Sequence, residues 1–92
     1  MSEIQRIKLD SHAVIAQVEA LSQQLDDAFL KGTPVVLDAS EVQRTDTSVL
    51  QLLVAFFTSM RKAGTSATWS SASDDFKDAA NLLGVADLIE LN

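Results

Sequence analysis

The chain contains no cysteine, and this absence excludes several kinds of chemistry at once. Without a thiol there can be no disulfide, no thiolate metal site and no cysteine nucleophile. A cysteine-free chain is compatible with a reducing cytoplasm. Met1 to Gln5 is polar and lacks the apolar region of a signal peptide, so we expect a cytoplasmic protein.

Residues that are typical of enzyme active sites are also scarce. His12 is the single histidine, and the three glycines stand apart from one another, so no nucleotide-binding loop and no nucleophile elbow is present. Asp38 and Asp46 could in principle act as paired carboxylates, as an acceptor aspartate does in receiver domains. Such domains also need an acidic cluster for Mg²⁺ and a lysine on a later strand, and Ser66 to Ser71 contains no lysine. We therefore expect no enzymatic activity, no cofactor and no metal site.

Positive charge is in short supply, and so are long hydrophobic runs. Seven lysines and arginines against 13 aspartates and glutamates give a net charge of −6. This balance argues against binding to nucleic acid or to an anionic membrane, which depends on clustered cations. The longest nearly apolar run, Leu50 to Phe57, is far shorter than the roughly 20 residues that a membrane span requires. We expect a protein partner, preferably a basic one, and no direct membrane insertion.

What the chain does contain is enough apolar residues for one modest core. The 92 residues are 47% hydrophobic, which predicts a single domain over residues 1–92. The predicted elements are, in order, a strand over about 4–9, a helix over about 14–31, a strand at 35–37, a helix over about 48–62, a strand at 66–71 and a helix from 73 that ends at Gly84. We expect Asp10 or Ser11 to cap the first helix. The last segment, Val85 to Leu91, is predicted as either a strand or a short helix.

The start of the middle helix is the best candidate for a functional site. Thr45, Asp46, Thr47 and Ser48 precede the helical apolar pattern, and one such residue is enough to cap a helix. Unpaired N–H groups and the positive end of the dipole favour a carboxylate or a phosphate at this point. Capping alone remains the simpler interpretation of the four residues.

The same helix is apolar on more than one face. Leu50, Leu53 and Phe57 lie on one stripe, and a neighbouring stripe is formed by Val49, Leu52 and Phe56. One stripe is enough to cover a small sheet. The second stripe therefore either packs against a flanking helix or forms a docking face beside Thr47.

A family resemblance lies in this region. The segment L-D-A-S-E-V-Q-R-T-D-T-S-V-L-Q-L-L resembles the signature of STAS domains, in which an apolar strand and an Asp are followed by a loop and by Asp-Ser/Thr-Ser/Thr-Gly-Leu at a helix start. The similarity extends over most of the chain, through Leu9-Asp10, the basic helix end at 61–64 and the segment 76–91. Val49 stands where the family usually has Gly, and the family's additional first strand is missing or shortened.

The resemblance implies an α/β fold, with a small mixed, mainly parallel sheet and helices packed chiefly on one side. It also implies a bacterial anti-sigma-factor antagonist, a non-catalytic module of signal transduction that acts by partner switching. In that family the hydroxyl after the Asp is phosphorylated, so Thr47 is the expected acceptor for a partner Ser/Thr kinase that is itself the anti-sigma factor, and Ser48 is the neighbouring hydroxyl. The residues expected to contact the partner are Asp46, Thr47, Ser48, Val49, Leu52 and Phe56.

The family also contains members that are not phosphorylated, and these are the alternative. A constitutive STAS subunit of an ABC-type lipid transporter would use Thr47 and Ser48 only for capping and partner contact. Short STAS proteins of chemosensory signalling complexes are a further option. The sequence leaves the oligomeric state open between a monomer and a homodimer.

Overall fold

The main sheet is built from three short strands, and alternate residues are buried in the central one. The computed structural model describes residues 4–91, and its strands are β1 (Gln5–Lys8), β3 (Val35–Ala39) and β5 (Ala67–Ala72). They pair in the order β1-β3-β5, and both pairings are parallel. A register irregularity lies between β3 and β5 at Leu37/Asp38. The mainly parallel sheet that the sequence predicts is thus confirmed.

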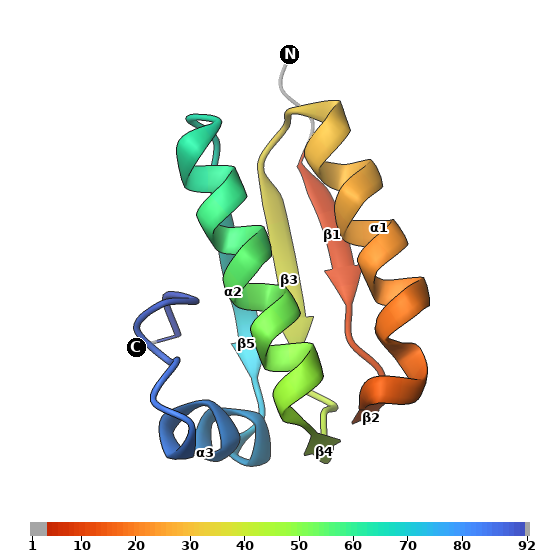
Figure 1. The fold of residues 1–92 in the computed structure, drawn as a ribbon, viewed down its shortest axis with the longest axis vertical. Coiled ribbons are helices and arrows are strands. Elements are labelled where there is room, and N and C mark those ends of the chain that lie inside the picture. The colour runs from red at the N-terminus through yellow and green to blue at the C-terminus, as the bar shows by residue number, and fades with distance from the viewer. Residues whose placement is uncertain (1–3, 92) are drawn as a thin grey trace.

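Two long helices connect the strands and lie side by side across one face of this sheet (Figure 1). They are α1 (Val18–Lys31) and α2 (Thr47–Lys62), while the shorter α3 (Asp74–Leu82) follows β5. A second, two-stranded parallel sheet pairs β2 (His12–Ala13) with β4 (Arg44–Thr45). These two short strands lie just before the helical segments and place the start of α2 beside the start of α1.

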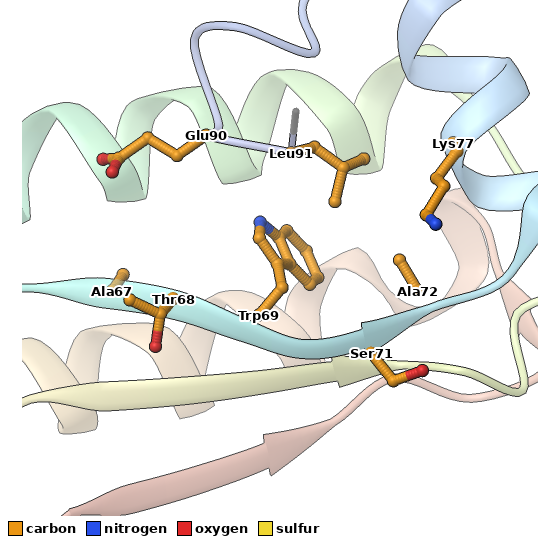
Figure 2. Close-up of a pocket in the computed structure, with 8 residues that line it drawn as sticks. All are labelled: Ala67, Thr68, Trp69, Ser71, Ala72, Lys77, Glu90 and Leu91. Carbon is orange, nitrogen blue, oxygen red and sulfur yellow. The ribbon is translucent and has the colours of Figure 1, made fainter.

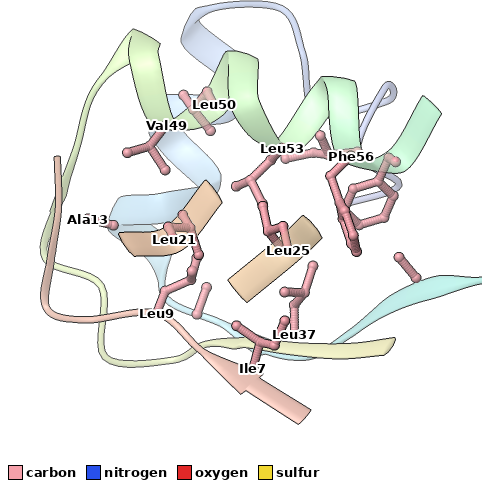
Figure 3. Packing of buried hydrophobic residues seen from close by; sticks show 14 of the residues in the cluster. Ile7, Leu9, Ala13, Leu21, Leu25, Leu37, Val49, Leu50, Leu53 and Phe56 are labelled. Carbon is pink, nitrogen blue, oxygen red and sulfur yellow. The ribbon is translucent and has the colours of Figure 1, made fainter. Parts of the chain in front are cut away.

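The hydrophobic core lies between the helices and the sheet (Figure 3). Ile7 and Leu37 of the sheet face Leu25 of α1 and Leu53 of α2, and all four side chains are buried. The alternate residues of the same strands, such as Arg6, are exposed or half-buried. Helices therefore cover one face of the sheet in the part of the chain that the structure describes, as the family resemblance implies.

Trp69 on β5 packs among aromatic rings rather than standing free as a stacking platform. Its ring lies 5.8 Å from that of Phe57 and 5.2 Å from that of Phe76. The indole Nε1–H donates to the carbonyl of Ile89 at 2.8 Å. Trp69 thus joins β5, α2 and the C-terminal segment.

The first helix begins later than the sequence predicts, and neither expected residue caps it. A 3-10 turn (Ile15–Gln17) precedes α1, and the N-cap residue of α1 is Gln17, which makes no side-chain capping bond. Pairing with β4 holds His12 and Ala13 extended, so no helix can start at Asp10 or Ser11. This part of the prediction is wrong because a contact between distant segments sets the boundary.

The C-terminal segment adopts neither of the two predicted forms. From Val85 onward the chain makes successive turns, in which the N–H of Leu88 donates to the carbonyl of Val85 and the N–H of Leu91 donates to that of Ala86. The fully buried side chain of Ile89 anchors these turns to the core. The prediction of a shortened first strand concerns residues 1–3, which lie outside the described residues.

Candidate functional site

Asp46 organises the start of α2. It is the N-cap residue, with extended backbone angles, and its Oδ1 accepts a hydrogen bond from the N–H of Val49 at 3.2 Å. Its Oδ2 accepts a second bond from the N–H of Ile15 at 2.8 Å, across 31 residues of sequence. One carboxylate therefore caps α2 and also holds the 3-10 turn before α1, so Asp46 positions the site.

Thr47 is the first residue of α2, and its side chain is exposed, whereas Ser48 is half-buried. Neither hydroxyl makes a hydrogen bond within residues 4–91. The backbone N–H groups of Thr47 and Ser48 precede the first intrahelical bond, which runs from the N–H of Leu50 to the carbonyl of Asp46. These two N–H groups and the positive end of the α2 dipole favour negative charge beside Thr47.

Thr45, the other hydroxyl of the predicted tetrad, faces the interior. Its Oγ1 is buried and has no hydrogen-bond partner among the described residues. A hydroxyl in this position is shielded from a protein kinase. The structure thus distinguishes Thr47 from Thr45 by exposure, which the sequence alone does not reveal.

Two residues of the expected docking face lie in the core instead. The side chain of Val49 is 0% exposed and that of Phe56 is 6% exposed. Val49 lies near Ala13 and Leu21, because α1 runs beside α2 and packs against the second apolar stripe of α2 (Figure 3). The expectation that Val49 and Phe56 offer an exposed apolar surface is therefore wrong. Leu52 is half-buried and remains at the surface of the helix pair.

An exposed apolar residue that sequence reasoning missed lies next to Asp46. Ile15 is 67% exposed, although its backbone N–H is held by the Asp46 carboxylate. A shallow hollow beside it is lined by Val18, Glu19 and Asp26. The sequence did contain a signal for this exposure, because Ile15 does not lie on the apolar stripe that Val18 and the later buried residues of α1 form. The prediction that the helix begins at residue 14 hid this signal.

A second hollow lies between α1 and α2, further from the start of α2. It has a volume of about 240 Å³ and is lined mainly by apolar side chains, among them Phe29, Leu52 and Ala55, with Asp26 at its rim. Together with Ile15, it forms a partly apolar surface with acidic side chains around it, on the same helix pair as Thr47. A basic partner with some apolar side chains would fit such a surface.

Asp38 and Asp46, the two carboxylates that the sequence singled out, each accept hydrogen bonds from different groups. Hydrogen bonding by Ser40, through its side chain and then its backbone N–H, lowers the pKa of the Asp38 carboxyl below its ordinary value, and the Ser40 N–H lies 2.8 Å from Oδ1. Asp46 is engaged by other groups, the N–H groups of Ile15 and Val49. No group of three or more potential metal ligands occurs in residues 4–91.

The chain matches a family model described as "Mlab, STAS domain" over residues 2–90, and it therefore belongs to the STAS domain family. Members of this family generally mediate protein–protein interactions and are generally non-catalytic. No curated protein matches the chain. Among the helices of residues 4–91, none combines the length and the apolar character needed to cross a membrane.

Proposed function

We propose that this STAS domain is a non-catalytic regulatory module whose partner docks at the start of α2, and that phosphorylation of Thr47 switches the docking off. The observation that carries the proposal is the exposed, unbonded hydroxyl of Thr47 at the first position of a capped helix. Thr47 also directly follows the Asp of the family signature. The partner that the resemblance implies is an anti-sigma factor that acts as a Ser/Thr kinase.

Phosphorylation at this point would change the surface without unfolding the domain. A phosphate adds about −1.5 to −2 charge and three strong acceptor oxygens. The free N–H groups of Thr47 and Ser48 and the α2 dipole can hold that charge in the isolated domain. In a complex, by contrast, the phosphate would have to be buried beside the Asp46 carboxylate and against the partner, which is costly.

The surrounding residues take distinct roles in this proposal. Asp46 positions the site, since both of its oxygens already accept backbone hydrogen bonds. Ser48 lies at the rim, half-buried. Ile15 and Leu52 supply apolar contact area, and the burial of Val49 and Phe56 removes those two side chains from the proposed surface.

The first prediction is that phosphate carried by this protein in its own cells is on Thr47. Intact-mass measurement and peptide mapping of protein purified from its native source test this, and Thr47→Ala should remove the modification. Phosphate on a different residue would contradict the assignment of the site. Unmodified protein under every growth condition would favour the alternative, a constitutive subunit of an ABC-type transporter or of a chemosensory complex.

The same experiment extends to binding once the partner that co-purifies has been identified. Thr47→Glu should weaken the complex by about tenfold or more, because a carboxylate is introduced into a buried interface. Thr47→Gln, which matches Glu in shape but has no charge, is the control and should bind like Thr47→Ala. Equal affinities for the Glu and Gln variants would show that charge at residue 47 does not regulate docking.

A further inference from the structure

A pocket of about 210 Å³ lies at the carboxyl end of β1, between residues 8–10 and α1. The buried apolar residues that line it come from four different parts of the chain and are Leu9, Ala13, Leu21 and Val49. Figure 3 shows these four side chains together at the end of the core where α2 begins. Ligands of α/β proteins bind in the crevice outside the carboxyl ends of the strands. The pocket therefore has the position and the apolar lining of a small-molecule site.

The polar side chains that line this pocket offer free hydrogen-bond acceptors. Asp10 and Gln24 make no hydrogen bond and no ion pair within residues 4–91. The amide nitrogen of Gln17 donates to the carbonyls of His12 at 2.7 Å and of Val14 at 3.3 Å, which leaves its own carbonyl oxygen free to accept. An ionised carboxylate only accepts hydrogen bonds, whereas the Gln24 amide can accept or donate. One of the free acceptors is therefore negatively charged.

The one cationic residue that lines the pocket is already paired elsewhere. The Nζ of Lys8 lies 2.7 Å from Oε2 of Glu41. Because successive side chains of a strand point to opposite faces of the sheet, Lys8 also lies on the other face from the buried Ile7. The charge of Asp10 is thus left without a partner among the described residues, and a positively charged ligand would supply one.

The larger pocket beside Trp69 lacks such one-sided chemistry (Figure 2). It has a volume of about 340 Å³, with Lys77 and Glu90 at its two ends. Glu90 is paired with Arg61 at 3.1 Å, and Lys77 is flanked by acidic residues within α3. The charges around that pocket therefore offset one another, and they select no ligand of one sign.

We propose that the pocket at the end of β1 binds a small primary amine with a branched apolar body. The ammonium group would donate to the Asp10 carboxylate and to the carbonyl oxygen of Gln17 or Gln24, while the apolar body would contact the buried lining. At about 30 Å³ for each water-sized group, the volume suits a ligand of about seven non-hydrogen atoms. The net charge of −6 also favours the approach of a cation over that of an anion.

A ligand in this pocket would act on the candidate site through Val49. Val49 lines the pocket, and its N–H is held by the Asp46 carboxylate at 3.2 Å. A bound amine would therefore stabilise the first turn of α2, which carries Thr47. The amine site does not require phosphorylation of Thr47, so either proposal can fail without the other.

The test titrates the full chain with three probes of one branched skeleton, isopentylamine, isopentyl alcohol and isovalerate, and follows the amide signals by NMR. Isopentylamine should bind about tenfold more tightly than the alcohol, because a hydrogen bond between charged groups is stronger than a neutral one. Isovalerate should bind least, since its carboxylate would face Asp10. The signals that shift should be those of Ala13, Leu21 and Val49, whereas the indole N–H of Trp69, in the pocket of Figure 2, should not move. Absence of amine binding, equal affinities for amine and alcohol, or shifts centred on Trp69 overturns the proposal.

Two variants with matched controls locate the ligand. Asp10→Asn keeps the shape of the side chain and removes its charge, so it should weaken amine binding by about tenfold and leave alcohol binding unchanged. Asp27→Asn, at an exposed position of α1 outside the pocket, should bind like wild type. Ala20→Leu places a larger side chain at the exposed mouth of the pocket and should abolish binding, whereas Ala55→Leu makes the same change on α2 and should not. Circular dichroism checks that every variant is folded. Full affinity of either pocket variant for the amine contradicts the assigned site.

Discussion

At the scale of single residues, the Asp46 carboxylate is the group on which the candidate site depends. It holds the N–H of Val49 in its own helix and the N–H of Ile15 in a distant turn. A hydrogen bond to a charged group stabilises more than a neutral one does, and here one side chain makes two. Thr47 can therefore be changed or modified without loss of the cap that defines the helix start.

The third prediction concerns Val49, the residue that stands where the family usually has Gly. Val49→Asp should destabilise the isolated domain by about 3–5 kcal/mol, because its fully buried site would receive a carboxylate without a partner. Urea unfolding followed by circular dichroism measures the loss. Gln51→Asp, at an exposed position two residues along α2, is the control and should stay within about 0.5 kcal/mol of wild type. If Val49→Asp were as stable as that control, Val49 would not belong to the core.

At the scale of elements, local signals in the sequence were sufficient to predict a helix or strand whose ends are set by residues close to it in the sequence. The helix expected from about Ser48 to Lys62 is α2, which begins one residue earlier and ends at the same residue, and Ser73 caps α3 where the sequence predicts a helix to begin. Asp46 and Thr47 could be placed at the start of α2 for the same reason. Caps, periodicity and turn residues all act within a few positions of one another.

Distant contacts decided the parts that could not be predicted. The pairing of His12–Ala13 with Arg44–Thr45 delays the start of α1, and no pattern within either dipeptide indicates it. The burial of Val49 depends on where α1 crosses α2, whereas periodicity shows only that two stripes exist. Ile15 belongs to the candidate site because its backbone N–H donates a hydrogen bond to Asp46, and no pattern in the sequence predicts this bond.

The fourth prediction tests α2 as the central element of the core. Leu53→Ala should cost about 2–5 kcal/mol, because Leu53 is fully buried between α1 and the sheet and the substitution leaves a cavity. Thermal unfolding should show the melting temperature falling by about 4–8 °C for each kcal/mol lost. Leu82→Ala is the matched control, since Leu82 is 88% exposed at the end of α3 and should tolerate the same change. An unchanged melting temperature for Leu53→Ala would remove Leu53 from the core.

At the scale of the whole molecule, the start of α2 and the outer edge of β5 lie on different parts of the fold. The start of α2 lies at the end of the sheet where the strands terminate, whereas the outer edge of β5 runs along its side (Figure 1).

The position of β3 between β1 and β5 has a consequence for how the molecule opens. β3 is the one strand of the main sheet with a neighbour on each side, so its amide protons are freed only when a pairing on one side or the other is lost. We predict that the amide of Val35, which donates to the carbonyl of Ser66 on the β5 side, stays protected while β1 frays, whereas amides of β1 such as that of Gln5, which donates to Pro34, exchange faster with solvent deuterium. Hydrogen exchange followed residue by residue in NMR spectra measures both rates. Equal protection of β1 and β3 would mean instead that the sheet opens as a single cooperative unit.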